Sequence, residues 1–164
     1  MSDNRWLRVG VPLVVAVLAG WWMISGGRSS EEDAIRARLL AGKAAWEAKD
    51  LAQFMGFFTH DYQDRSGMLN YGALLEIHRS RIFSERCTLQ ADIDLDHLRV
   101  KVAGAKATVS FDATGSRDCG NGPSYFVGQP GRKTPITLEL VKTGAISKDW
   151  KVAASSGVAN ADGL

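Results

Sequence analysis

The spacing of apolar residues changes once along this chain of 164 residues, near Glu85. Before that point apolar residues recur every three or four positions, which is the period of an amphipathic helix. After it they alternate with polar residues, which is the period of a strand with one buried face. The pattern predicts an α+β fold in which three helices pack on one face of about four antiparallel strands.

The three expected helices each begin at a residue that can cap a helix N-terminus, namely Ser30, Asp50 and Asn70. Between the second and third helices, HDYQDRSG predicts a turn in which Gly67 takes positive φ. The apolar stripes are Ile35, Leu39, Gly42 and Trp46, then Leu51, Phe54, Met55 and Phe58, and finally Tyr71, Leu74, Leu75, His78 and Ile82.

The expected strands start at Leu89. Apolar residues alternate from Leu89 to Leu95 and continue in the opposite parity from Leu98, so we expect a β-bulge near Asp96 and His97. The features that follow are a hairpin turn at 103–105, a strand over 107–113, a Gly-rich loop over 115–131, a strand over 136–140, a turn at Gly144 and a last strand from Trp150 to Ala154.

The N-terminal segment contains nineteen consecutive residues without a charge, from Val9 to Gly27. A helix of about 20 apolar residues crosses the hydrocarbon core of a bilayer. Arg5 and Arg8 precede the segment and favour a cytoplasmic N-terminus, which places the following domain on the exported, periplasmic side of a bacterial-type inner membrane. The alternative is a signal peptide cleaved after Ala19, which would give a secreted protein.

These signals predict five parts. They are a cytoplasmic N-terminus over residues 1–8, a transmembrane helix over 9–27, a linker over 28–30, a folded domain over 31–156 and a flexible tail over 157–164.

The folded part is electrically neutral. Three of the twenty Lys and Arg residues and one of the eighteen acids precede residue 30, which leaves seventeen of each sign. Nucleic-acid binding depends on an excess of positive charge. We therefore expect no nucleic-acid partner.

Three stretches resemble the nuclear transport factor 2-like (NTF2-like, SnoaL-like) superfamily: AAWEAKDLAQFMGFFTHDYQDRSG, LRVKVAGAKATVSF and LELVKTGAISKDWKV. The resemblance covers roughly residues 31–156. It implies a cone-shaped fold in which a curved, mostly antiparallel sheet of four or more strands wraps around three helices and leaves a pocket. The superfamily includes isomerases, dehydratases, polyketide cyclases and many non-catalytic members, so the resemblance implies a fold and no single activity.

The resemblance also suggests a role for Asp64. In the ketosteroid-isomerase branch a catalytic acid lies after the second helix and three residues before a glycine, as Asp64 does here. A base of this kind needs burial to raise its pKa toward the working pH. The isomerases add an oxyanion-stabilising tyrosine from the first helix, but the matching position here is Leu40. The alternative is that Asp64 bonds the backbone of its own turn.

His78 is the second candidate for acid–base chemistry. It lies between Leu75 and Ile82 on the apolar side of the third helix, where it would face the pocket as an acid or a base. The alternative is a core histidine with satisfied hydrogen bonds. The aromatic residues expected in the pocket wall or the core are Trp46, Phe58, Tyr62 and Tyr71.

Metal and cofactor signals are weak. Asp92, Asp94 and Asp96 resemble the start of an EF-hand loop, but the sixth position is His97 instead of glycine, and the twelfth is Ala103 instead of glutamate. The three histidines show no metal-ligand spacing. The segment GNGPSYFVGQPG lacks the Lys-Ser/Thr of a phosphate-binding loop. We expect neither a metal nor a cofactor.

The two cysteines are expected to form a disulfide. In a hairpin centred near Gly104, opposing residue numbers sum to about 207 or 208 by antiparallel pairing, and Cys87 and Cys119 come within one bulge of that value. Opposed residues of this kind lie within disulfide range, and a disulfide fits an exported domain. The alternative is two unrelated buried thiols.

Two functions remain open at this stage. The first is a membrane-anchored, non-catalytic module that binds a small molecule or a protein, with a homodimer or partner on the sheet face. The second is an isomerase, dehydratase or cyclase with Asp64 as general base and His78 as acid.

Overall fold

The computed structural model describes residues 31–83, 86–144 and 149–157. The expected transmembrane helix over 9–27 and its linker lie outside these ranges. Within them, no helix combines the length and the apolar character needed to cross a membrane.

Helices form the first part of the fold, as the apolar spacing predicts. Residues 31–47 are helical, and α2 (Leu51–Met55) and α3 (Tyr71–Ile77) follow, with a π-helical turn η1 (His78–Ile82) continuing α3. Two of the three predicted caps are confirmed, and the third, Ser30, lies outside the described residues. The Asp50 side chain accepts a hydrogen bond from the backbone N–H of Gln53, and the Asn70 side chain accepts one from Ala73.

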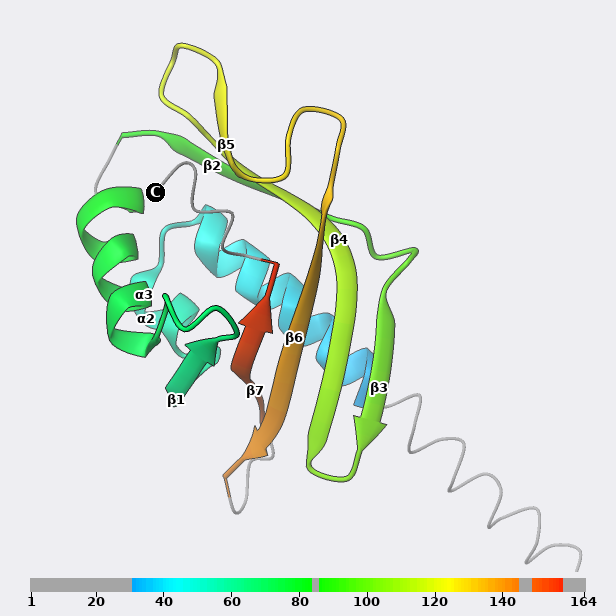
Figure 1. Ribbon diagram of the computed structural model, residues 1–164. Helices are drawn as coiled ribbons and strands as arrows, with labels where there is room; N and C mark the ends of the chain where they lie inside the picture. Colours follow the sequence, from blue (N-terminus) through cyan, green and yellow to red (C-terminus); the bar gives the residue numbers. More distant parts are fainter. Residues whose placement is uncertain (1–30, 84–85, 145–148, 158–164) are drawn as a thin grey trace, which may run out of the picture.

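A single curled sheet of seven strands wraps around the helices (Figure 1). Its main path runs β1–β7–β6–β4–β2, and β3 and β5 also pair with β4. The 13-residue β4 holds the sheet together, because its first half pairs with β3 and β6 and its second half with β2 and β5. The strands are β1 (Phe58–Asp64), β2 (Thr88–Ile93), β3 (Arg99–Ala103), β4 (Lys106–Asp118), β5 (Pro123–Val127), β6 (Thr134–Thr143) and β7 (Asp149–Ser156).

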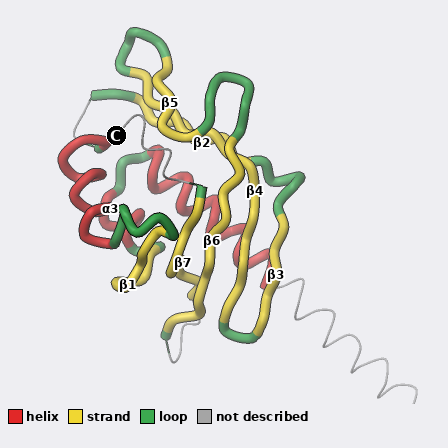
Figure 2. Tube along the Cα trace, in the orientation of Figure 1, coloured by secondary structure: helices red, strands yellow, loops and turns green. Residues whose placement is uncertain are grey.

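The helices lie on one side of the sheet and the core lies between the two layers (Figure 2). Ile35 and Val109 are completely buried there, one from the first helix and one from β4. On the other face of the sheet the paired positions are polar, as in Ser110 opposite Thr137 and Thr108 opposite Glu139. For the first helix and β4, the apolar stripe and the strand alternation therefore identify the buried face correctly.

The segment HDYQDRSG is mostly strand, so the prediction of a turn there is wrong for its first half. β1 occupies residues 58–64 and pairs in parallel with β7, and only residues 65–68 turn. Phe58, expected in the stripe of the second helix, is the first residue of this strand. The paired residues of β1 and β7 lie 91–94 positions apart in the sequence, so the partner strand gives no local signal, and the tertiary pairing overrides the local preference.

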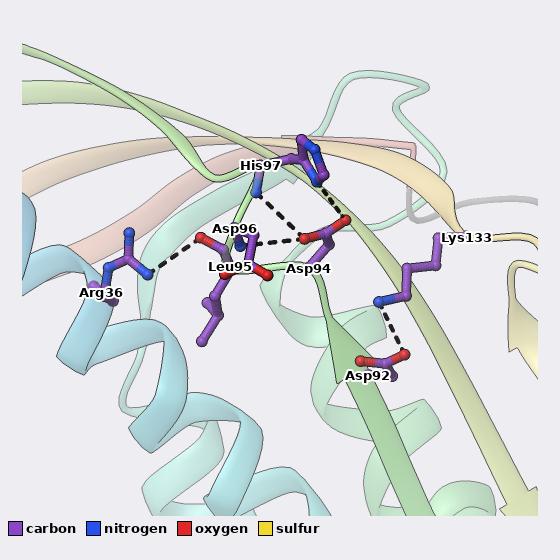
Figure 3. Close-up of polar contacts among 7 residues, drawn as sticks. All are labelled: Arg36, Asp92, Asp94, Leu95, Asp96, His97 and Lys133. Atoms are coloured by element: carbon purple, nitrogen blue, oxygen red, sulfur yellow. Dashed lines mark hydrogen bonds and ion pairs between the residues drawn. The ribbon is translucent and has the colours of Figure 1, made fainter.

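The expected β-bulge near Asp96 and His97 is a tight turn between β2 and β3 (Figure 3). The Asp94 carboxylate accepts hydrogen bonds from the backbone N–H groups of Asp96 and His97, and its other oxygen lies 2.8 Å from His97 Nδ1. Arg36 of the first helix donates to the carbonyl oxygen of Leu95 at 3.2 Å and ties the turn to the helix layer.

The Gly-rich stretch over 115–131 is also more ordered than a loop. It contains the end of β4 and the whole of β5, which pairs with β4. The alternation of apolar and polar residues does not reveal β1 or β5, because burial does not alternate strictly along either strand.

The predicted disulfide between Cys87 and Cys119 is confirmed, with a Cα–Cα distance of 4.2 Å. The two residues extend the register of β2 and β4 by one pair beyond Thr88 and Asp118. The bond closes a loop with a sequence separation of 32 residues and holds the end of β4 to β2.

Candidate functional site

An apolar cavity of about 280 Å³ lies between the helices and the inner face of the sheet. The aromatic segment at the α2–β1 junction contributes much of its wall, because α2 ends at Met55 and the chain returns along the sheet as β1. Pockets that bind small molecules are typically apolar with a few placed polar groups. The lining side chains come from six elements and include Trp46, Phe54, Phe58, Phe111, Leu138 and Val152.

Two residues that line this cavity are joined by a hydrogen bond between their hydroxyl groups. The hydroxyl oxygens of Tyr62 on β1 and Ser155 on β7 are 2.7 Å apart, and both residues are 3% exposed. Burial raises the pKa of Tyr62, the hydrogen bond with Ser155 opposes this, and the charge of Asp64 adds to the rise. Tyr62 is therefore a neutral phenol, able to donate or accept a hydrogen bond.

The pair has one hydrogen more than its own bond uses. Two hydroxyl groups carry two O–H hydrogens, and a single bond between them uses one, whichever oxygen donates. Neither Tyr62 nor Ser155 has a second side-chain partner among the described residues. One O–H donor of the pair therefore has no second side-chain acceptor among the described residues.

A bulge in β7 places Ser155 on the buried face. Leu140 pairs with Val152 and Glu139 with Ala154, which leaves Ala153 without an opposing residue. Side chains alternate along a strand, and one extra residue reverses the parity. Trp150 and Val152 are buried before the bulge, and Ser155 is buried after it. Sequence reasoning missed Ser155, because nothing local marks the bulge.

His78 also lines the cavity, but both of its ring nitrogens are engaged. Nδ1 lies 2.8 Å from the Leu74 carbonyl oxygen, and Nε2 accepts a hydrogen bond from Trp46 Nε1 at 3.3 Å. Because the indole N–H can only donate, His78 carries its proton on Nδ1. Burial lowers the pKa of His78, and the bond to Leu74 opposes this. The ring is neutral and has no free nitrogen for a ligand.

Asp64 lies outside the cavity lining, although it is only 5% exposed. One carboxylate oxygen accepts a hydrogen bond from the backbone N–H of Leu69 at 2.8 Å. The other accepts from the backbone N–H and the hydroxyl of Ser66. Burial by itself raises the pKa of Asp64, but the hydrogen bonds from Ser66 and Leu69 outweigh it and lower the pKa. Asp64 is an ionised carboxylate that closes the turn after β1.

Comparison of the structure with solved structures shows which fold this is. A Novosphingobium aromaticivorans protein described as NTF2-like with a cystatin-like fold matches with a TM-score of 0.56 at 13% identity, covering 94% of this chain and 88% of that one. A protein from the same species, provisionally named a scytalone dehydratase, matches with a TM-score of 0.62 at 12% identity, covering 80% and 85%. The chain has the NTF2-like fold.

Other comparisons add limits to this result. Bdellovibrio bacteriovorus Bd1075 matches with a TM-score of 0.60 at 12% identity, and the match covers 80% of this chain but only 41% of Bd1075. No protein-family model and no curated protein sequence matches the chain. At these identities the likeness concerns the fold and leaves the function open.

The structure brings four of the predicted site residues together. Trp46, Phe58, Tyr62 and His78 all line the apolar cavity. Tyr71 does not, and its ring instead lies 4.9 Å from that of His60. The position of the isomerase tyrosine, Leu40, is 42% exposed and also outside the lining.

The three aspartates that resemble the start of an EF-hand loop lie at the end of β2 and in the turn after it. Among the described residues, no three His, Cys, Asp or Glu side chains lie close enough together to hold an ion. Of the three aspartates that resemble an EF-hand start, Asp94 bonds its own turn and Asp92 forms an ion pair with Lys133.

Proposed function

We propose that this chain is a membrane-anchored, non-catalytic binding module whose cavity takes a small, mostly apolar molecule with one hydrogen-bond acceptor. The observation that carries the proposal is the spare O–H donor of Tyr62 and Ser155 inside an otherwise apolar cavity. A ligand carbonyl or ether oxygen would accept that hydrogen, while its hydrocarbon part would contact the aromatic wall.

The energetics favour a ligand with an acceptor. A buried donor without a partner costs about 1–3 kcal/mol. A bound oxygen removes this cost, whereas a hydrocarbon of the same shape does not. A preference of about 1.4 kcal/mol corresponds to a tenfold difference in affinity, so the acceptor should be visible in binding measurements.

The absence of a catalytic role is supported by the positions of the two acid–base candidates. His78 uses both ring nitrogens, and Asp64 is bonded to its own turn away from the cavity. A general base must come within hydrogen-bond reach of the proton that it removes. For Asp64 this would require the turn after β1 to open.

An enzyme remains the second candidate, because some proteins with this fold carry enzyme names. One solved neighbour is provisionally named a scytalone dehydratase and another an aromatic ring hydroxylase. In this alternative the chain is an isomerase, dehydratase or cyclase with Asp64 as base. Turnover that disappears in Asp64→Asn while the fold is kept would support it.

The location in the membrane is proposed from the sequence alone. Residues 9–27 would form the anchor, with Arg5 and Arg8 on the cytoplasmic side and the binding domain on the periplasmic side. A partner or second copy on the sheet face would meet polar groups such as Thr108, Ser110 and Glu139.

The proposal can be tested with two ligands that differ in one functional group, 2-acetonaphthone and 2-ethylnaphthalene. The core cluster lies within residues 35–152, so residues 30–160 can be studied without the apolar segment. We expect quenching of tryptophan fluorescence to give about tenfold tighter binding for the ketone, from one added hydrogen bond.

The variants remove one or both of the hydroxyl groups of Tyr62 and Ser155. Tyr62→Phe or Ser155→Ala alone leaves one O–H in the cavity, so each should keep the preference for the ketone. The double variant removes both hydroxyls and should bind the two naphthalenes equally. Ser110→Ala, which removes a hydroxyl from the other face of the sheet, is the matched control. No binding of either naphthalene, or a ketone preference that survives in the double variant, would refute the proposal.

A further inference from the structure

Gly42 lies in the interior of the first helix, which spans residues 31–47, and it lines the apolar cavity. A glycine in the middle of a helix lowers the folding equilibrium constant about fivefold relative to alanine. A glycine at this position therefore needs a reason. The backbone conformation, the packing and the cavity are the three reasons that the structure can test.

The backbone conformation does not require glycine at position 42. The glycines with positive φ include Gly67 and Gly104, which lie in turns, and Gly42 is not among them. Gly42 continues a regular helix, a conformation that alanine adopts more readily than glycine does.

The packing does not require glycine there either. A Cβ atom at position 42 would have the ring of Phe57 as its nearest neighbour, at 3.7–3.9 Å, which is ordinary van der Waals contact. At Gly128, by contrast, a Cβ atom would lie only 2.8 Å from the carbonyl oxygen of Arg132. Close approach of the backbone therefore explains Gly128 and does not explain Gly42.

The cavity is the remaining reason. Phe57 also lines it, and Cζ of Arg38 lies 4.0 Å from the centroid of the Phe57 ring. Arg38 is itself fixed, because it donates hydrogen bonds to the carbonyl oxygens of Gly56 and Trp150. With the Phe57 ring covered in this way, a side chain at position 42 that is longer than a methyl group would extend past the ring into the cavity. The bare backbone at Gly42 therefore preserves volume beside the helix.

The cavity is larger than a single aromatic ring needs. An apolar protein cavity of about 150 Å³ is large enough to bind benzene, whereas this cavity measures about 280 Å³. Aromatic rings pack against one another edge-to-face or in offset stacks. Such rings are frequent in the lining, which includes Trp46, Phe54, Phe58 and Phe111.

We propose that Gly42 determines the size of the ligand, because its missing side chain leaves room against the first helix for a flat molecule of two or three fused rings. This role rests on the proposed function of the cavity, and it adds the ligand class and the residue that selects it. Alanine at position 42 would make the helix more stable and the cavity smaller, so the two effects can be measured separately.

The probes are three methyl ketones with one, two and three rings, namely acetophenone, 2-acetonaphthone and 2-acetylphenanthrene. Residues 30–160 contain the whole core cluster and are used because these ketones would dissolve in the lipid that the proposed anchor requires. Binding is followed by quenching of tryptophan fluorescence. We expect the wild type to bind a fused-ring ketone at least about tenfold more tightly than acetophenone, since each added ring buries more apolar surface.

Gly42→Ala and Gly42→Leu add bulk in two steps. Gly42→Ala should raise the unfolding temperature by about 3–5 °C through helix propensity. It should also bind the largest ketone that the wild type accepts about tenfold more weakly, because the cavity is then overpacked. Gly42→Leu should lose measurable binding of that ketone, and both variants should bind acetophenone as the wild type does.

Ala44→Leu is the matched control for added bulk. Residue 44 is exposed on the same helix and lies outside the cavity lining, so all three ketones should bind this variant as they bind the wild type. Gly42→Ala remains decisive if Gly42→Leu does not fold, because its methyl group fits beside Phe57.

The outcomes separate the role of Gly42 from the proposed function. If the wild type binds none of the ketones, the proposed function fails and the role of Gly42 fails with it. If the wild type binds them, only the role of Gly42 is refuted by a preference for acetophenone, or by Gly42 variants that keep the wild-type affinities. A lower unfolding temperature for Gly42→Ala would also refute it, because the packing would then require the glycine.

Discussion

The role of Asp64 can be decided by replacing it with asparagine. In the wild type, one carboxylate oxygen accepts from Leu69 and the other from two groups of Ser66. Asparagine keeps an acceptor for Leu69 but places an N–H group against the backbone N–H of Ser66. It also removes the negative charge that strengthens these bonds.

The magnitude follows from the number of bonds affected. A hydrogen bond to a charged group contributes about 1.5–3 kcal/mol, and at least the Ser66 backbone bond is lost. We expect Asp64→Asn to lower the free energy of unfolding by about 2 kcal/mol. With a urea dependence of about 1–3 kcal/mol per molar for small domains, the midpoint should fall by roughly 1 M.

The pH dependence gives a second, independent check. The pKa of Asp64 is lowered in the folded protein from its ordinary value of 3.8. The carboxylate therefore contributes its stability fully above about 3.8, and this contribution is lost as the pH falls below that value through the folded pKa. The stability gap between wild type and Asp64→Asn should be constant near pH 7 and close in acid.

The assay is urea unfolding of residues 30–160 followed by near-ultraviolet circular dichroism, with Asp61→Asn as the control. Asp61 is exposed on the same strand, so this change should shift stability by less than about 0.5 kcal/mol. If Asp64→Asn unfolds at the wild-type urea concentration, then the carboxylate does not hold the turn. The reasoning from its hydrogen bonds would then be refuted.

Two further predictions concern His78 and the disulfide. Burial lowers the pKa of His78 below 6.5 in the folded protein, so the contribution of neutral His78 to stability is fully present above pH 6.5 and declines as the pH falls. Between pH 7.5 and 5, the urea midpoint should therefore fall more for the wild type than for His78→Gln. Equal falls in the two proteins would contradict this. Replacing Cys87 and Cys119 together with alanine opens a loop of 32 residues and should cost about 4 kcal/mol by the chain-entropy relation, measured by non-reducing urea unfolding. Free thiols at both positions in the native protein would contradict the pairing.

Local chemistry in the sequence identified several features of the fold correctly. Asp50 and Asn70 cap their helices because a short acceptor side chain precedes an apolar stripe. The pairing of Cys87 with Cys119 was predicted correctly from hairpin geometry, although β2 and β3 pair with β4 in registers that differ by a few residues. From Ile93 to Ala103 the chain advances ten residues while β4 advances seven, and the turn at Asp94 holds the difference.

Long-range features of the site could not be predicted in the same way. The partner of Tyr62 is Ser155, 93 residues away, and it reaches the buried face only because Ala153 bulges. The sequence around Asp64 suggested a turn, but the strand before it depends on pairing with β7. Periodicity reports which face of an element is buried, and it does not report which distant element covers that face.

The parallel pairing of β1 with β7 has a consequence for the order in which the chain can fold. Residues 58–64 leave the ribosome well before their strand partner, residues 149–156, which follows about 90 positions later in the sequence. Until β7 has been synthesised, the backbone of β1 has no strand partner and the aromatic side chains near it are exposed to solvent. Both conditions favour aggregation. The pocket can therefore close only after almost the whole domain has been synthesised, and a chain truncated before residue 149 would contain most of the wall residues without enclosing a cavity.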